Sequence, residues 1–344
     1  MEMVPVSSSA MIGAHPDRDS RMRPDLQTIE TNGIRLRVAL AGAGPLVVLI
    51  HGFPESWYSW RHQIPALADA GYRVAAPDVR GYGGSDKPLA IEDYSIKDMC
   101  ADIDGLIAAL GAERAVVVGH DWGAAIAYRT AMFHPERVRA VAGLGVPYLA
   151  RGPMPSIQLF RKIYEDRFFY QLYFQEPGVA EAELEADVRT SLRKLYYWGS
   201  GDRQIANAAT IDNAPGPGLL DRLLDPNPFP AWLTEADLDY FASQFRNSGF
   251  RGPLNRYRNS ERDFEQLAKF DGKPLTHPTA FMAGSLEPVL RMIPGVDMVE
   301  LMRKQCTDLR YVSLMEGAGH WLQQERPTEV NAALLEFLRG LPAT

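Results

Sequence analysis

Residues 115–133 read AVVVGHDWGAAIAYRTAMF, and this stretch decides the fold. Its first four residues are continuously apolar, as expected of a parallel strand covered on both faces, and the pattern from Trp122 to Phe133 predicts a helix. Between them, GHDWG has the small-x-nucleophile-x-small spacing of a nucleophile elbow, with Asp121 at its centre. The positive end of the following helix favours an ionised, attacking carboxylate. An Asp here could equally be a simple helix N-cap, so the pentapeptide alone leaves both interpretations open.

The segments around this stretch alternate between strand and helix patterns. Residues 34–40 alternate apolar and polar side chains, which predicts a half-solvated strand near a sheet edge. Further apolar runs predict buried strands, and helical periodicity separates them; the strands are expected at 46–50, 74–76, 279–283 and 311–314, and the helices at about 95–110, at 122–133 and from about Pro327 onward. This order predicts an α/β fold with a mostly parallel central sheet flanked by helices.

The alternation stops near Pro147, and residues 150 to 265 have helical patterns only. We expect Ser156 to cap a segment ending near 177–178, and a capping box at Thr234–Asp237 to open a helix with an apolar stripe. Residues 214–218 predict a loop. The predicted organisation is a flexible N-terminal extension (1–24), a first core part (25–148), an inserted all-helical cap or lid domain (149–266) and a second core part (267–344).

Composition narrows the classes of function. The formal net charge of −7 argues against nucleic acid, which selects for basic surfaces. No uncharged apolar run approaches the about 18 residues that span a bilayer, and the N-terminal residues lack the apolar centre of a secretory signal. Cys100 and Cys306 are the only cysteines, which excludes a disulfide framework and fits a reducing compartment. We therefore expect a cytoplasmic protein without membrane or nucleic-acid partners.

Two further polar residues follow predicted strands. Glu287 comes just after the strand at 279–283, and His320 comes after the strand at 311–314 on the small-residue loop GAGHW. The order Asp121, Glu287, His320 is the nucleophile, acid, base order of α/β-hydrolases. Residues that follow parallel strands collect at the carboxyl edge of a sheet, so these three are expected to meet. Asp297 is an alternative acid if the loop is arranged differently.

Two glycine-containing loops are expected beside this edge. HGFP, residues 51–54, follows the strand at 46–50, and the N–H groups of Phe53 and Trp122 could form an oxyanion hole. DVRGYGGSD, residues 78–86, follows the next strand; it lacks the Lys-Ser/Thr ending of a phosphate loop, and its Asp and Arg side chains are expected to brace loops. We expect Phe53, Pro54, Trp122 and Trp321 to line the substrate pocket.

Together these motifs resemble the epoxide hydrolase branch of the α/β-hydrolases, from about Gln27 to the C-terminus. Within the insertion, residues 170–178 and 248–259 resemble the cap segments of mammalian-type soluble epoxide hydrolases. The resemblance implies that Tyr170 and Tyr257 are the cap tyrosines that hold the epoxide oxygen; Tyr173 is the nearest competing tyrosine. The family usually has Asp as the acid where this chain has Glu287, which remains a carboxylate able to orient the base.

The implied reaction has two steps and needs no cofactor or metal. Asp121 attacks an oxirane carbon while the two tyrosines donate to the leaving oxygen; His320 then activates water that hydrolyses the resulting ester to a vicinal diol. Several aromatic residues of the insertion could line the pocket or fill the cap core, namely Phe168, Phe169, Tyr173, Phe174, Tyr196, Tyr197 and Trp198. If they line the pocket, the substrate is a sizeable apolar or aromatic epoxide.

A haloalkane dehalogenase and a non-catalytic receptor remain open as alternatives at this stage. Haloalkane dehalogenases share an Asp nucleophile followed by Trp, but they typically have Asn where this chain has Phe53, and a departing halide needs no proton from tyrosine. A serine esterase would have Ser at position 121. A non-catalytic small-molecule receptor could be built on the same fold. The sequence leaves the oligomeric state open between a monomer and a homodimer.

Overall fold

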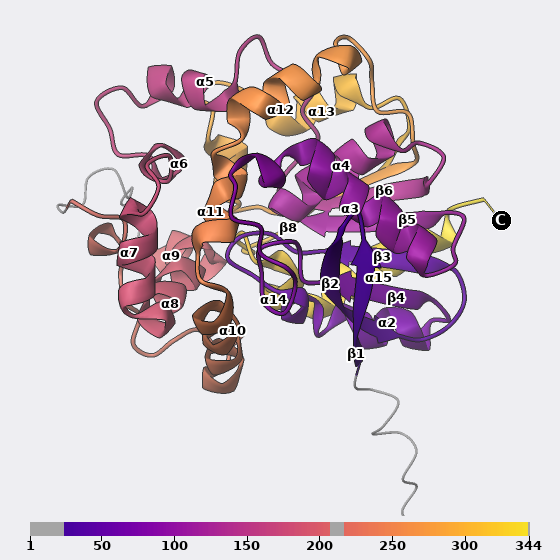
Figure 1. Cartoon of the computed structure of the whole chain (residues 1–344), viewed down its shortest axis with the longest axis horizontal. Coiled ribbons are helices and arrows are strands. Elements are labelled where there is room, and N and C mark those ends of the chain that lie inside the picture. Colours follow the sequence, from indigo (N-terminus) through magenta and orange to yellow (C-terminus); the bar gives the residue numbers. More distant parts are fainter. Residues whose placement is uncertain (1–23, 207–216, 343–344) are drawn as a thin grey trace, which may run out of the picture.

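The computed structural model describes residues 24–206 and 217–342. Within them, eight strands form one sheet in the order β1-β2-β4-β3-β5-β6-β7-β8 (Figure 1). Their bounds are β1 Asp25–Thr31, β2 Ile34–Ala41, β3 Leu46–Ile50, β4 Arg73–Pro77, β5 Ala115–His120, β6 Val138–Leu144, β7 Thr279–Gly284 and β8 Leu309–Met315. Every predicted strand is present, and the α/β prediction is confirmed; β1 and β6 were not predicted.

The sheet is parallel from β4 to β8, and only β2 runs antiparallel to its neighbours β1 and β4. The strand order places β2 second from the edge of the sheet, and its alternating pattern predicted a position near an edge. In the centre, Ile50 of β3 pairs with Gly119 of β5, and Gly119 pairs with Gly143 of β6. This register ends neighbouring strands at the same level, so the loops that follow them share one edge of the sheet.

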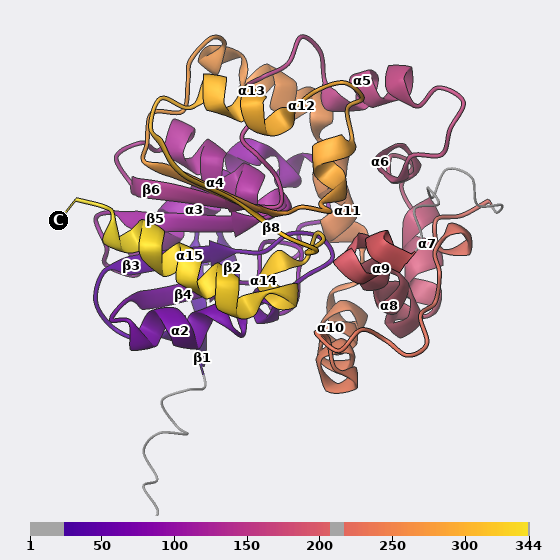
Figure 2. The same ribbon diagram turned by 180° about the vertical axis from the view of Figure 1, so that it is seen from behind.

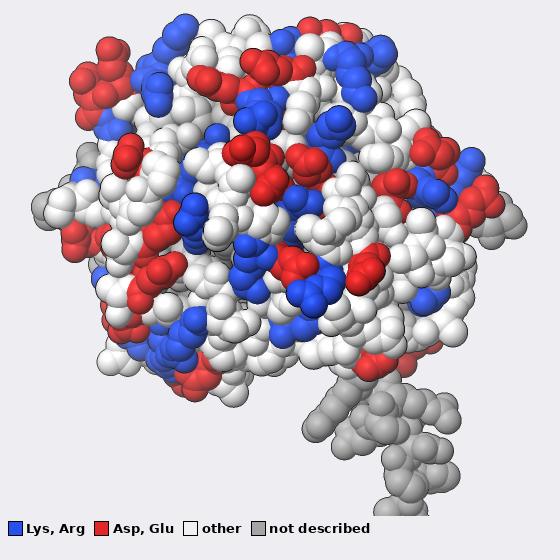
Figure 3. All heavy atoms as spheres, in the orientation of Figure 1, with Lys and Arg blue, Asp and Glu red and all other residues white. Residues whose placement is uncertain are grey.

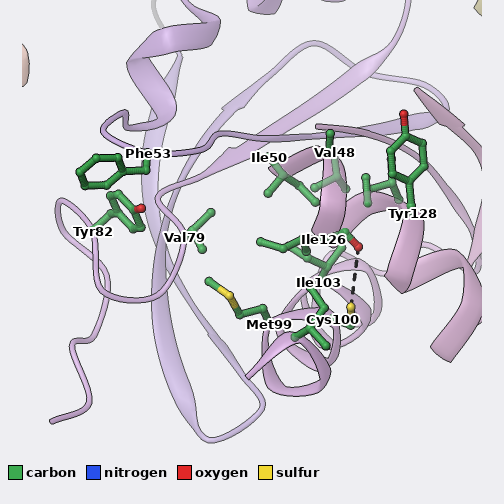
Figure 4. Close-up of a cluster of buried hydrophobic side chains, with 14 of the residues drawn as sticks. Val48, Ile50, Phe53, Val79, Tyr82, Met99, Cys100, Ile103, Ile126 and Tyr128 are labelled. Carbon is green, nitrogen blue, oxygen red and sulfur yellow. Dashed lines mark hydrogen bonds between the residues drawn. The ribbon is translucent and has the colours of Figure 1, made fainter. Parts of the chain in front are cut away.

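Helices cover both faces of the sheet. α3 (Ile96–Ala109) and α4 (Trp122–Phe133) lie on the face seen in Figure 1, while α2 (Gln63–Asp69), α14 (Leu322–Glu325) and α15 (Pro327–Arg339) lie on the face seen in Figure 2; α13 (Met298–Gln305) connects β7 to β8. Figure 4 shows the apolar layer where β3, α3 and α4 meet, with Cys100 donating to the carbonyl oxygen of Ile126. Such dry layers on both faces explain the continuously apolar strands.

Between β6 and β7 the described chain is helical, as the sequence predicted. α5 to α10 gather on one side of the sheet, and α11 runs between them and the core (Figures 1 and 2). The bounds are α5 Ser156–Ile163, α6 Tyr170–Tyr173, α7 Val179–Ala186, α8 Val188–Gly199, α9 Gly201–Ala206, α10 Glu235–Ser248, α11 Arg251–Tyr257 and α12 Ser260–Gln266. We call these helices and their connections the cap.

Local predictions within the cap had mixed outcomes. The capping box at Thr234 is present, with Asp237 as its third helical residue, and the stripe on α10 is buried. The prediction for Ser156 was wrong: it is the first residue of α5, which ends at Ile163, and its hydroxyl bonds to Ser260 instead. Of the predicted extension at 1–24, all but Pro24 lies outside the described residues, as do residues 214–216 of the loop predicted at 214–218; Pro217 and Gly218 belong to no helix or strand.

The face shown in Figure 3 carries intermixed positive and negative side chains rather than one extended patch of either sign. Among the helices of residues 24–206 and 217–342, none combines the length and the apolar character that crossing a bilayer requires.

Candidate active site

Asp121 occupies a strained turn between β5 and α4. Its φ of 53° and ψ of −121° lie in a region that side-chain-bearing residues rarely adopt. The flanking glycines are required by close backbone approach: a Cβ atom on Gly119 would lie 2.0 Å from the carbonyl oxygen of Gly123, and one on Gly123 would lie 2.0 Å from that of Ile50. The pentapeptide therefore forms the tight elbow that its spacing predicted.

The Asp121 carboxylate does not cap the helix that follows it. No hydrogen bond joins it to the first turn of α4; instead, Oδ1 accepts from the N–H of Phe53 at 2.9 Å. Trp122 is the first residue of α4, where backbone N–H groups have no partner inside the helix. Of the two N–H groups expected in the oxyanion hole, that of Phe53 binds the carboxylate; this bond, and the lack of a capping bond, argue against the simple N-cap interpretation.

His320 and Glu287 complete a chain of side chains that starts at Asp121. His320 Nε2 lies 3.5 Å from Asp121 Oδ2, and its Nδ1 lies 2.9 Å from both carboxylate oxygens of Glu287. Glu287 is buried, and one of its oxygens also accepts the N–H of Val289. Asp297, the alternative acid, caps α13 through the N–H of Glu300. The structure therefore places Glu287, not Asp297, beside the histidine.

The two carboxylates control the charge of the histidine. Burial by itself lowers the pKa of His320, but Glu287 and Asp121 outweigh burial and hold this pKa well above its ordinary value. The two carboxylates therefore favour the protonated form of His320 in the resting site. Any reaction that neutralises Asp121 removes part of this stabilisation and makes His320 a freer base.

Tyr170 and Tyr257 face the same space from the cap. They come from α6 and α11, and their ring centroids lie 6.2 Å apart. Burial, followed by the Asp121 charge, raises the pKa of both phenols, so both remain protonated donors. The competing Tyr173 points elsewhere: it hydrogen-bonds with Glu183 and lines neither of the cavities described next.

Two cavities within the described residues meet at Asp121, Tyr170 and Tyr257. One has a volume of about 340 Å³ and is lined by Phe53, Pro54, His320 and Trp321, together with cap residues. The other, about 290 Å³, has Trp122 in its wall. Of the cap aromatics singled out by sequence, those that line the first cavity are Phe169, Phe174 and Trp198, and those that do not are Phe168, Tyr173, Tyr196 and Tyr197.

Sequence reasoning missed a buried pair behind the histidine. His120 Nε2 donates to the carbonyl oxygen of His320 at 2.7 Å, and its Nδ1 lies 2.8 Å from Glu55. Burial raises the pKa of Glu55, but the opposing effects of His120 and the Gly52 N–H bring it down to about 2. The signal was available, because His120 sits inside the GHDWG pentapeptide and Glu55 directly follows HGFP.

The predicted bracing by residues 78–86 is also visible. Asp78 pairs with Arg37 and accepts the N–H of Trp57, while Arg80 pairs with Asp102. These buried contacts fix the loop after β4 without reaching Asp121.

Comparison with known proteins adds independent information. A family model described as the alpha/beta hydrolase fold matches residues 45–327. Epoxide hydrolase A of Mycobacterium tuberculosis is 50% identical over 323 residues, covering 92% of this chain and 98% of the relative. The bifunctional epoxide hydrolase 2 of Rattus norvegicus is 42% identical over 89% of this chain and 54% of its own length. The crystal structure of epoxide hydrolase A from Mycobacterium thermoresistibile superposes with a TM-score of 0.86 at 48% identity, covering 93% of this chain and 100% of that one.

Proposed function

The chain belongs to the epoxide hydrolases of the α/β-hydrolase superfamily, and we propose that it opens its substrate through a covalent ester formed on Asp121. One observation carries this mechanism. A single carboxylate has one oxygen bound by the Phe53 N–H and the other facing His320, at the point where two tyrosine-lined cavities meet. That arrangement supports a nucleophile, a base and proton donors acting on one substrate.

In the first step Asp121 attacks an oxirane carbon. The more accessible oxygen for attack is Oδ2, since Oδ1 is engaged by the Phe53 N–H. As the new carbon–oxygen bond forms, the strained bond to the epoxide oxygen breaks, and that oxygen takes a proton from Tyr170 or Tyr257. The need for this proton favours an epoxide over a haloalkane, whose halide leaves without one.

In the second step water hydrolyses the ester. His320 Nε2 takes a proton from a water molecule, whose oxygen attacks the Asp121 carbonyl carbon. Charge then develops on Oδ1, where the N–H groups of Phe53 and Trp122 stabilise it. Collapse breaks the acyl–oxygen bond and leaves an oxygen from water in Asp121. The proton on His320 passes to the departing oxygen to complete the vicinal diol, and the second proton of the water, left on the new Asp121 carboxyl, restores the tyrosine.

The pKa of His320 fits this order of events. In the resting enzyme Glu287 and Asp121 hold the imidazole protonated, and in that form it cannot act as a base. Esterification removes the Asp121 charge, so the pKa of His320 falls when a base is needed. Glu287 remains to orient the ring through Nδ1.

We further propose a sizeable apolar or aromatic epoxide as the substrate, because Phe169, Phe174 and Trp198 line the first cavity and the walls of both cavities are mostly apolar and aromatic. The two free, buried cysteines support a cytoplasmic location. The protein is proposed to act as a monomer or homodimer without nucleic-acid or membrane partners.

A single turnover in heavy-oxygen water tests the covalent mechanism. With enzyme in excess over styrene oxide, the peptide that contains Asp121 should gain one heavy oxygen, and the diol should carry none from water. Label found only in the diol would show that water attacks the epoxide directly and would reject the ester.

A further inference from the structure

The loop that carries His320 is in direct backbone contact with the cap. The His320 N–H donates to the carbonyl oxygen of Gly199 at 2.7 Å, at the end of α8. A Cβ atom on Gly319 would lie 2.3 Å from the nitrogen of Gly201, and one on Gly201 would lie 2.1 Å from the oxygen of Gly317. The two segments are therefore packed with no room for side chains, and a shift of one must move the other.

One buried carboxylate joins these segments. Glu325, at the end of α14, is 7% exposed. Its Oε2 accepts the N–H groups of Gly201 and Gly319, each at 2.9 Å, and its Oε1 accepts that of Trp321 at 3.0 Å. Gly319 and Trp321 are the immediate neighbours of His320, while Gly201 belongs to the cap. The same side chain thus holds the base loop on both sides of the histidine and ties it to α9.

The three hydrogen bonds require both carboxylate oxygens of Glu325 to act as acceptors. Only an ionised carboxylate accepts at both positions, whereas the amide of Gln would turn a donor toward at least one of the N–H groups. Burial raises the pKa of Glu325, and the three N–H groups oppose that rise, as expected of bonds made to the charged form.

We propose that Glu325 is a positioning residue for His320, which holds the base in line with Asp121 and makes its position depend on the docked cap. This inference rests on the proposed two-step mechanism. Only the second step needs His320 as a base, so a displaced base loop slows ester hydrolysis and leaves ester formation unchanged. A residue needed only for folding would reduce both steps together.

The test uses the full chain with Glu325→Gln and styrene oxide. We expect kcat to fall by about ten- to a hundredfold, the loss typical of a misplaced catalytic group. KM should fall in parallel, so that kcat/KM stays within about twofold, because the enzyme rests as the ester when hydrolysis is slow. Intact-mass measurement of acid-quenched samples should then find protein heavier by one substrate.

The controls separate the possible failures. Glu329→Gln makes the same charge change at an exposed position of α15 and should leave kcat and KM unaltered. His320→Asn should accumulate the ester; if it does not, the two-step mechanism is wrong and this inference falls with it. If His320→Asn accumulates ester but Glu325→Gln loses kcat and kcat/KM equally without an adduct, the positioning role alone is rejected. Should Glu325→Gln not fold, Glu325→Asp, which keeps the charge but not the reach, is judged by the same criteria.

Discussion

The active site draws on two regions that are held in different ways. Asp121 follows a strand that is hydrogen-bonded on both sides, to β3 and β6, so directional backbone bonds fix its place. Tyr170 and Tyr257 lie on short cap helices, and their rings pack against other aromatic rings. The ring centroids of Tyr170 and Trp198 lie 5.5 Å apart, and those of Tyr257 and Phe174 lie 5.1 Å apart. Backbone register leaves little freedom, whereas ring packing tolerates adjustment. We therefore expect substitutions of the core residues to abolish activity and substitutions of the cap tyrosines to reduce it by degrees.

The largest effect is expected for Asp121→Ala, because among residues 24–206 and 217–342 no other carboxylate lines the two cavities. Diol formation should fall by at least about 10⁴-fold, as is usual when a covalent nucleophile is removed. The measurement is initial diol production from styrene oxide, with circular dichroism to show that the variant is folded. Substantial turnover by the variant would mean that the core does not hold the nucleophile and would remove the contrast with the cap.

Removing the cap hydroxyl groups one at a time should reduce the rate of ring opening in steps. Tyr170→Phe and Tyr257→Phe each keep the ring and remove one proton donor, so each single variant should slow ring opening by about ten- to a hundredfold while the other phenol substitutes. The double variant should lose about 10³-fold or more. Rapid-quench measurement of ester formation separates this step from hydrolysis. Equal rates in a single variant and the double variant would indicate that only one tyrosine donates.

Glu287→Gln tests the core through the carboxylate that orients His320, and leaves the Asp121 nucleophile in place. Loss of orientation should slow ester hydrolysis by about 10²-fold or more, with ester formation nearly intact. The sign of the pH effect follows from charge: Glu287 helps to hold the pKa of His320 above its ordinary value, so removing that charge lowers it. The acid limb of the rate–pH profile for ester hydrolysis should therefore move to lower pH. A limb that moves to higher pH would contradict this account of the histidine.

The same contrast explains what the sequence could predict. Continuous apolar runs predicted the parallel strands, and a helix was predicted after GHDWG. Asp121, Glu287 and His320 were then found because each follows the end of a strand, and parallel register places such residues together. β6 escaped prediction because Val138–Leu144 contains a Gly and an Arg and lacks a clear apolar run. β1 lies at the sheet edge with five of its seven residues exposed, and its polar sequence DLQTIET offers no hydrophobic pattern.

The cap residues were beyond pattern analysis. Tyr170 lies on a four-residue helix, too short for any periodicity, and only family resemblance separated it from Tyr173. Glu55, His120 and Glu325 were missed for another reason. The motifs marked the positions of His120 and Glu55, but not the bond between them across 65 positions, and Glu325 bonds to Gly201 across 124 positions; no local spacing encodes either contact. Long-range polar contacts are the part of the site that only the structure reveals.

The smallest expected effect tests a cap feature that the sequence did predict. Thr234 is exposed, and its hydroxyl accepts the Asp237 N–H at the start of α10. Thr234→Ala should lower the free energy of unfolding by about 1 kcal/mol, measured by urea denaturation, while Thr234→Ser should retain most of it. Because α10 carries neither tyrosine, kcat and KM should not change in either variant. If Thr234→Ala instead altered KM without loss of stability, the tyrosines would depend on remote cap helices, and the positions of Tyr170 and Tyr257 could not be attributed to local ring packing alone.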